Sequence, residues 1–475
     1  MDSIGGVSLD TLVQQYRISQ RKPALALENR KTSLKARLNA LSDVKSKLDA
    51  LLAAMKDLSL TGSSSKFLAF SVSSSLTNIA TASASSAASK GSHTLLVTQL
   101  AKADTIVSSR LTSSATSVVT AEGTGTKTIR LSVNGTNTDI NITLASGDTN
   151  TSILSNIAAA VNASGANVTA SVVSDTSSTS KLVFTSKTTG STNAVSLTDV
   201  TGTLLDNIGL TDAIISGRTA STSTTGGYLY SSTASLDANF KLDGIDIVRG
   251  TNTVSDALTG VTIELKATQS VTDTPVALTV GVDKATIRSK VEDFIKKYNE
   301  ALTTLTAKTA VDPDTKVRQI LAGDFVFRNL RTNLRGIASG AVSSVMTGNP
   351  KVLSDIGIKT ASDGTLSLSD VAAFDSALDS DIAKVEDLFN STNGIAVQLK
   401  TLTDSFVKTG GEIETTSSSA SSQITNLTSQ IKRFDEQLDR KVERFRDDFA
   451  RIQSAIAFAA RQQEMVRAIL SGGFF

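Results

Sequence analysis

The stretch ITNLTSQIKRFDEQLDRKVERFRDDFARIQSAI, residues 424–456, decides the fold of this chain. Its apolar residues recur at steps of three and four, which places them on one narrow stripe of a long helix. A stripe this narrow cannot form a globular core by itself, so it requires a partner helix in the same chain or in another copy. The stripe consists of Ile424, Leu427, Ile431, Phe434, Leu438, Val442, Phe445, Phe449, Ile452 and Ile456.

The same spacing returns near the N-terminus, at Leu34, Leu38, Leu41, Leu48, Leu52 and Met55. We therefore predict two coiled-coil stalk segments, residues 1–65 and 412–475, whose stripes form coiled-coil and oligomer contacts. Pro23 is expected to break the first helix or to stand in its first turn. Residues 17–47 hold nine basic and two acidic side chains. We interpret this run as the solvated face of a helix whose partner is acidic.

Between these ends, apolar residues recur at every second position. Residues 93–283 alternate over short runs separated by Gly, Asn, Asp and Ser, which predicts inserted antiparallel β-rich domains. One helix, around Ile157, interrupts the strands, and Asp243-Gly244 is a hairpin signal. The Ser- and Ala-rich residues 66–92 are expected to form a linker and one strand of the leg domain.

Residues 284–411 return to helical spacing and contain a second hairpin signal, Asp363-Gly364. We expect a helical leg domain here that includes this short hairpin. The predicted fold class is α+β and multidomain. Its terminal helices pair, a helical-plus-strand domain lies in the middle, and the β-rich domains are inserted between them.

Composition excludes several kinds of chemistry. The chain has 475 residues, no Cys and one His, which removes thiol chemistry, thiolate metal sites and multi-histidine sites. His93 begins a predicted strand, and no carboxylate is near it in sequence. We therefore predict no enzyme activity, no catalytic residue, no metal and no cofactor.

Charge and hydropathy restrict the partners. The net charge of +2 gives no general attraction to nucleic acid. No apolar run approaches the length of a membrane span. The first residues lack the basic and apolar regions of a signal peptide, so we expect export without a cleaved signal.

Several stretches resemble the bacterial flagellar filament cap family, also called hook-associated protein 2, in the order of that family. They are Ile4-Gly-Gly-Val-Ser-Leu-Asp10 with Leu12-Val13 and Arg21-Lys-Pro23, then Thr94 to Ala103, Phe240 to Arg249, Asn252 to Val261, Phe294 to Asn299 and Leu353 to Leu368. Residues 127–199 are similar to an insert shared with flagellin and hook proteins. Tyr16-Arg-Ile-Ser19 departs from the family, which has a more apolar stretch there.

The resemblance implies an extracellular structural cap at the distal tip of the flagellar filament. Such a cap holds exported flagellin while it folds and inserts, and it prevents the loss of flagellin. The implied assembly is a homo-oligomer of about four to six copies. Other implied partners are flagellin, the flagellar type III export apparatus and an export chaperone.

Two other functions stay open at this stage. One is another rod-type flagellar component, either a hook–filament junction protein or a divergent flagellin. The other is a surface adhesin whose Ser/Thr-rich β domains bind host glycan or mucin, which would add cell adhesion to cell motility.

Overall fold

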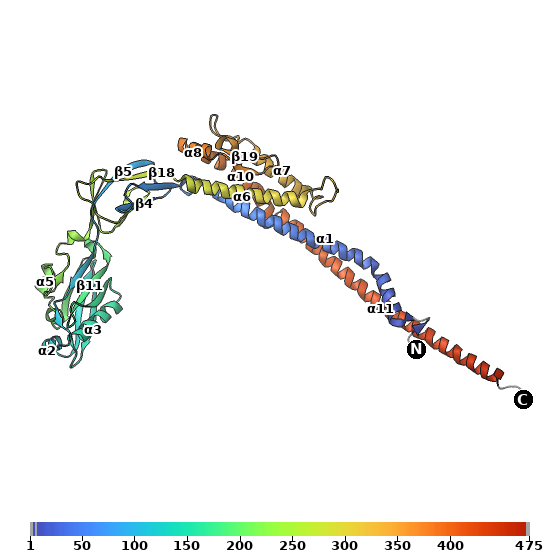
Figure 1. Cartoon of the computed structure of the whole chain (residues 1–475), viewed down its shortest axis with the longest axis horizontal. Coiled ribbons are helices and arrows are strands. Elements are labelled where there is room, and N and C mark those ends of the chain that lie inside the picture. Colours follow the sequence, from blue (N-terminus) through green and yellow to red (C-terminus); the bar gives the residue numbers. More distant parts are fainter. Residues whose placement is uncertain (1–2, 5–6, 472–475) are drawn as a thin grey trace. The chain divides into compact units, whose positions relative to one another are not determined.

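The computed structural model describes residues 3–4 and 7–471 and divides into two compact units (Figure 1). The helical unit joins the two ends of the chain, up to Phe67 and from Lys284 onward. The β-rich unit is the continuous segment Leu68–Asp283. The ladders between the described strands are antiparallel. This arrangement confirms a multidomain α+β fold.

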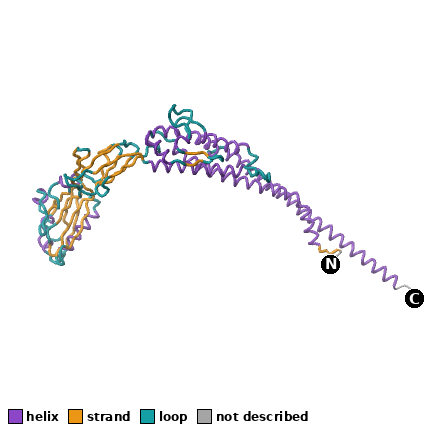
Figure 2. Tube along the Cα trace, turned by 45° about the horizontal axis from the view of Figure 1, so that its top comes forward, coloured by secondary structure: helices purple, strands orange, loops and turns teal. Residues whose placement is uncertain are grey.

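The helical unit is built on two long helices, which Figure 2 shows in purple. Its strands are short and lie at the start of the chain and in one hairpin. The helices are α1 (Leu9–Leu58), α6 (Lys284–Thr309), α7 (Phe325–Ser339), α8 (Val371–Ser380), α9 (Ile382–Asn390), α10 (Ile395–Val407) and α11 (Glu412–Ser471). The strands are β1 (Ser3–Ile4), β2 (Val7–Ser8), β19 (Ile358–Thr360) and β20 (Leu366–Leu368).

Helix α1 runs without interruption through Pro23, so the expected break at this residue is wrong. Ser8 caps the helix by accepting a hydrogen bond from the backbone N–H of Thr11 at 3.3 Å. A proline inside a helix costs about 3 kcal/mol because one backbone hydrogen bond is lost. The packing of α1 on other helices offsets this cost, and Ala24, next to the proline, is completely buried.

The β-rich unit consists of two lobes. The lobe formed by the first and last strands of the unit, which we call the outer lobe, contains two facing sheets. The larger sheet has the order β15-β14-β5-β18-β3 and the smaller one β16-β17-β4. Their strands are β3 (Phe70–Ser74), β4 (Ala80–Ala84), β5 (Gly91–Gln99), β14 (Ala238–Leu242), β15 (Ile245–Arg249), β16 (Thr253–Leu258), β17 (Val261–Leu265) and β18 (Val276–Val282). Alternate residues of both sheets share one core, which includes Phe240 and Ile263.

The segment 66–92 was expected to belong to the leg domain, and the structure corrects this assignment from Leu68 onward. Strand β3 pairs with β18, which lies more than two hundred residues later in the chain, and β4 pairs with β17, which lies nearly two hundred residues later. The sequence could not reveal this placement because the pairing is set by partners far away in the chain.

The inner lobe is inserted between β5 and β14 and has its own core. One sheet has the order β10-β11-β6-β13, with β7 also pairing with β11, and the other has the order β12-β8-β9. The strands are β6 (Ala103–Val107), β7 (Leu111–Thr112), β8 (Gly125–Val133), β9 (Thr136–Leu144), β10 (Val168–Ser174), β11 (Thr179–Thr189), β12 (Val195–Thr201) and β13 (Gly227–Tyr228). The helices are α2 (Ser117–Glu122), α3 (Asn150–Ala163), α4 (Leu204–Asn207) and α5 (Asp212–Ser216).

The flagellin-like insert expected at residues 127–199 is not a separate fold. Strand β11 pairs with β6, which precedes the insert, and β6 pairs with β13, which follows it. Strands β10 and β11 therefore share a sheet with β6, β7 and β13 of the flanking segments, and residues 127–199 share one core with these segments.

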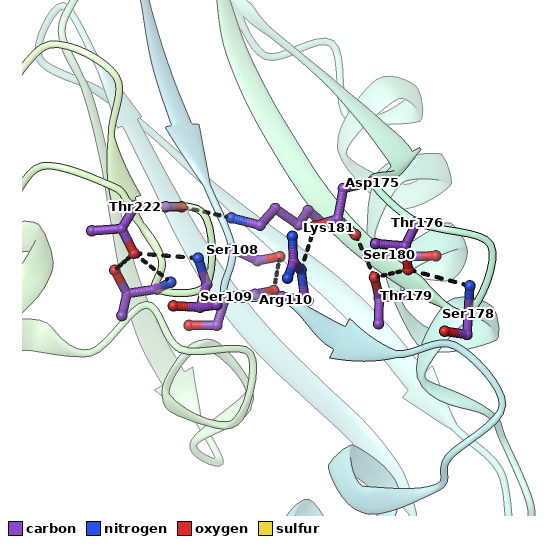
Figure 3. A network of polar contacts seen from close by, with 12 residues as sticks. Ser108, Ser109, Arg110, Asp175, Thr176, Ser178, Thr179, Ser180, Lys181 and Thr222 are labelled. Atoms are coloured by element: carbon purple, nitrogen blue, oxygen red, sulfur yellow. Dashed lines mark hydrogen bonds and ion pairs between the residues drawn. The ribbon is translucent and has the colours of Figure 1, made fainter.

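A polar network fastens loops of the inner lobe to β11 (Figure 3). The Lys181 ammonium donates to the Thr222 carbonyl at 2.9 Å, and Arg110 Nε donates to Asp175 at 2.6 Å. Burial lowers the pKa of Lys181, and the nearby Asp175 carboxylate opposes this shift. Since the partners come from several loops, the network holds these loops against the sheet.

The hairpin at Asp243-Gly244 forms as predicted, with positive φ at both residues, 52° and 83°. The fold brings a carboxylate beside His93, although none is near this residue in sequence. His93 Nδ1 is 2.7 Å from Asp243 Oδ2, and the Thr94 backbone N–H donates to Asp243 Oδ1 at 2.7 Å. These hydrogen bonds, led by the one from His93, lower the pKa of Asp243 and hold the turn against β5.

Candidate assembly surface on the terminal helices

The two long helices, α1 and α11, pack against each other in antiparallel orientation. Their direction follows from the ion pairs, since Arg17 meets Asp439 and Arg21 meets Asp435. A small apolar core fills the seam between them. It consists of the buried residues Val13, Leu438 and Val442 with the partly buried Leu9, Tyr16, Phe434 and Phe445.

One aromatic stack lies in this seam. The rings of Tyr16 and Phe445 are nearly parallel, with centroids 4.8 Å apart and an interplanar angle of 7°. Tyr16 begins the stretch that departs from the family pattern, and its ring covers Phe445. Sequence reasoning missed Leu9, Val13 and Tyr16 as seam residues, although their spacing of four and three residues is the same signal that identified α11.

The ion pairs across the seam are exposed to solvent, at 47% and 57% of the side-chain area for Arg17 and Asp439. Exposed pairs contribute about 0–1 kcal/mol each, so they contribute more to register than to stability. Further basic residues of α1 also meet acidic partners, one at the N-cap of α7 and one on α6. Arg37 pairs with Asp324 at 2.7 Å and Lys47 with Glu300 at 3.0 Å, as expected for a basic face with acidic partners.

The second half of α1 enters a bundle with α6 and α10. Its antiparallel direction relative to α6 follows from pairs that join Asp43 to Lys308 and Asp57 to Lys290. The hydrogen bond from Lys47 lowers the pKa of Glu300 on α6. The stripe residues Leu41, Leu48, Leu52 and Met55 are buried here, together with Leu58 at the end of the stripe. Val44 and Leu51, which sequence reasoning did not select, are also buried.

The predicted stripe residues therefore have three different environments. The buried ones are Leu41, Leu48, Leu52, Met55, Leu427, Leu438, Val442 and Phe449. The partly buried ones are Leu34, Leu38, Ile424, Ile431, Phe434 and Phe445. Ile452 and Ile456, at 52% and 51% exposed, face solvent. Most of the stripe is thus covered within one chain.

The exposed part of the stripe lies where α11 passes the start of α1. Both views show α11 continuing beyond the N-terminal end of α1 (Figures 1 and 2). Within residues 3–4 and 7–471, no helix is long and apolar enough to cross a membrane. In the same part of the chain, no group of three or more potential metal ligands gathers at one place.

The comparison with known families decides the identity of this architecture. Residues 5–104 match the family model "Flagellar hook-associated protein 2 N-terminus", and residues 235–460 match "Flagellar hook-associated protein 2 C-terminus". The two matches together cover more than half of the chain, in the order of the family. The chain belongs to the flagellar hook-associated protein 2 family.

Relatives in this family are similar over nearly their whole length. The A-type flagellar hook-associated protein 2 of Pseudomonas aeruginosa is 29% identical over 92% of this chain and 89% of the relative. The flagellar hook-associated protein 2 of Escherichia coli K12 is also 29% identical, over 94% of this chain and 92% of the relative.

A solved structure shares the fold. The D1-D2-D3 domains of the flagellar cap protein FliD from Escherichia coli match with a TM-score of 0.62 and 27% identity. The match covers 80% of this chain and 99% of that structure. The likeness therefore extends across both the helical and the β-rich parts of the fold.

Proposed function

We propose that this chain is the structural cap at the distal end of the bacterial flagellar filament. It promotes the folding and insertion of exported flagellin and prevents the loss of flagellin from the tip. The observation that carries the proposal is the ordered family match over most of the chain, supported by the likeness to a solved flagellar cap protein. The site of action is extracellular, at the flagellum tip.

The proposed work requires no covalent catalysis and no cofactor. A cap acts by making contacts that differ between successive arrangements on the filament end. The paired part of α1 and α11 suits such a role because its seam is narrow and its core is small. A seam of this kind can change its angle or register at a lower cost than a large globular core.

The stalk is proposed to consist of the α1–α11 pair, and the plate of β-rich units. The stripe residues have two roles in this proposal. Those that are buried within one chain hold the stalk together. Those past the start of α1, beginning at Ile452, are left for contacts between chains.

The proposed partners are further copies of this chain and flagellin. An assembly of about four to six copies is proposed, because several stalks are needed to rest on a filament end. We also propose that the flagellar type III export apparatus delivers this chain with the help of an export chaperone, and that no signal peptide is cleaved.

The test is deletion of the gene for this chain. Cells lacking it should shed monomeric flagellin into the medium, carry hooks without filaments and fail to swim. A version that lacks residues 1–60 and 412–475 should not rescue swimming, because the plate would have no stalks. Normal filaments in the deletion strain would overturn the proposal.

The same experiment separates the other functions considered from the sequence. Loss of a divergent flagellin would shorten or remove filaments without releasing a second, intact flagellin. Loss of an adhesin alone would reduce attachment while swimming stayed normal. A lost junction protein would be recognised by filaments that detach together with their caps.

A further inference from the structure

The two lobes of the β-rich unit have separate apolar cores. The structure describes every residue of this unit, and the chain crosses between the lobes at residues 100–102 and 231–237. Two bodies that share no large apolar interface are expected to move relative to each other. A hinge at the two crossings would therefore be the ordinary arrangement. The contacts between the lobes, which we call the joint, indicate the opposite.

The first crossing is held through both backbone groups of Ala101. The Ala101 N–H donates to Asn252 Oδ1 at 2.7 Å, and Asn252 Nδ2 donates to the Ala101 carbonyl at 2.9 Å. The amide group of Asn can donate and accept at the same time, so one side chain binds both groups. Asn252 lies between β15 and β16 of the outer lobe, and its carbonyl accepts from the Leu265 N–H of β17 at 2.8 Å. These bonds fix the first crossing to the outer lobe.

The second crossing is fixed by a buried side chain and by the first crossing. Leu236 is completely buried, and its carbonyl accepts a hydrogen bond from the Lys102 N–H at 2.8 Å. The side chain of Gln99, at the end of β5, donates to the Ala234 carbonyl at 2.9 Å. A hinge requires a few residues whose backbone angles can change freely. Bonds between the two crossings oppose such a change in both of them.

A turn of the inner lobe, which follows β11, makes a third attachment. Thr189 Oγ1 donates to the Gly250 carbonyl of the outer lobe at 2.6 Å. The Ser191 backbone N–H donates to Asp237 Oδ1 in the second crossing at 2.7 Å. This turn is not a crossing, so its bonds are additional to the chain connections. A third attachment removes rotation that two crossings alone would allow.

The backbones of the two lobes meet most closely at Gly190 and Gly250. Gly190 has a φ of 100°, which favours glycine, and its N–H donates to the Lys102 carbonyl at 3.1 Å. A Cβ atom on Gly190 would stand 2.6 Å from both the Cα and the carbonyl oxygen of Gly250. A side chain at this position would therefore push the two backbones apart.

We propose that the joint holds the two lobes as one rigid body, so that the β-rich unit does not bend between them. The inference stands on the contacts of the joint and does not rest on the cap function. For the proposed cap it adds a constraint. The changes of arrangement on the filament end would have to occur outside the joint.

A distance between two spin labels tests the rigidity. The full chain has no Cys, so labels attach only to introduced thiols. Val173→Cys on β10 and Ile245→Cys on β15 place one label on each lobe, at side chains that are 47% and 67% exposed. Labelled full-length chains are mixed with an excess of the unlabelled chain, so that distances between copies do not contribute. Double electron–electron resonance should give one narrow distance distribution. A broad distribution or two separate distances would overturn the proposal.

Two variants test the contacts themselves. Gly190→Ala forces the backbones apart, and Asn252→Asp keeps the shape of the side chain but places a charged oxygen beside the Ala101 carbonyl. Each should broaden the distance distribution or add a second distance. The matched controls are Gly281→Ala, where a Cβ atom meets nothing within 4 Å, and Asn137→Asp at an exposed position of β9. Both controls should keep the narrow distribution. A distribution that stays narrow in both joint variants would overturn the assignment of rigidity to these contacts.

Folding and function are measured separately from rigidity. Circular dichroism shows whether each variant keeps its strands, and Asn252→Asp carries the test if Gly190→Ala does not fold. The distance measurement uses purified protein, whereas the cap function is tested by the swimming of the deletion strain. Loss of swimming with a broad distance distribution in the unaltered chain would sink this inference and leave the cap function standing.

Discussion

Tyr16 and Phe445 secure the end of the stalk near the start of α1 through a single aromatic stack. A stacked pair contributes about 0.5–1.5 kcal/mol beyond the area that it buries. Tyr16→Ala should therefore open the seam locally, with faster amide hydrogen exchange at residues 10–20 and 438–449. Tyr16→Phe keeps the ring and should behave like the unaltered chain. If Tyr16→Phe exchanges as fast as Tyr16→Ala, the stack is not the stabilising contact.

We expect Asp199 to make the stability of the β-rich unit depend on pH. Burial raises the pKa of Asp199 to about 6, even though its carboxylate accepts a hydrogen bond from the Leu205 backbone N–H at 3.0 Å. In an unfolded chain the pKa of an Asp is about 3.9. Because the folded value is the higher one, the folded state favours the protonated form. This contribution to stability is complete at pH below about 4 and is lost as the pH rises through about 6.

The raised pKa of Asp199 gives a testable prediction about stability. The free energy of unfolding of the β-rich unit should rise as the pH falls from 7.5 to 5, and Asp199→Asn should reduce this dependence. A raised pKa of this size corresponds to about 2–3 kcal/mol at most. Thermal unfolding of the full-length chain and of Asp199→Asn at both pH values measures the effect. Since the two chains differ at one residue, other titrating groups cancel in the comparison. An unchanged pH dependence in the variant would contradict the assignment.

At the scale of elements, the stalk and the β-rich unit should unfold separately. Leu438 is 3% exposed and packs in the small core of the seam. Burying a Leu contributes about 1.5–3 kcal/mol, and a buried charge adds a further penalty. Leu438→Asp should therefore unfold the paired part of α1 and α11, weaken self-association and leave the melting of the β-rich unit nearly unchanged.

The matched control is Gln437→Asp, which places the same charge on an exposed neighbouring position of α11. It should keep both the helical content and the association state. Circular dichroism and sedimentation measure the two properties. Unchanged oligomers in Leu438→Asp would count against a role of this seam in assembly.

Proteolysis tests the layout of the elements. From the sequence alone, both ends should be trimmed to a core near residues 66–411. The structure predicts a longer core, because the second half of α1 packs on α6 and α10. Trypsin should first cut the exposed end of α11, at Arg461 and Arg467. Residues 41–58 should remain bound to the core. Mass spectrometry of the early fragments identifies the first cuts. A first cut within 240–400 would contradict the layout in which the β-rich unit is inserted into the helical unit.

The sequence predicted elements with regular patterns and missed those fixed by distant partners. Alternating residues identified β8, β9 and β10, and the Asp-Gly turns identified both hairpins, because these signals are local. Helix α10 was missed, although Leu399 and Phe406 on it are buried. The pairing of His93 with Asp243 was also missed, because 150 residues separate them. On the candidate surface, the spacing of α11 was predictable, whereas the part of it that α1 covers was not.

At the scale of the whole molecule, the chain enters and leaves the β-rich unit at one place. Phe70 on β3 is paired with Val282 on β18, and the Asp283 backbone N–H donates to the Ala69 carbonyl at 2.9 Å. Paired residues of adjacent antiparallel strands have Cα atoms only about 4.5–5.5 Å apart. A short linker is therefore enough to join the two parts of the helical unit where the β-rich unit is inserted.

We expect that a chain in which a short Gly-Ser linker replaces residues 70–282 will fold its helical unit. Closing so short a loop costs little conformational entropy, and the cores of the helical unit lie outside the removed segment. The variant should show a cooperative thermal transition by circular dichroism, and it should fail to retain flagellin because the plate is missing. The control is Val271→Ser, which changes an exposed position of the β-rich unit and should keep both folding and retention. A spliced chain without cooperative unfolding would show that the two units depend on each other for stability.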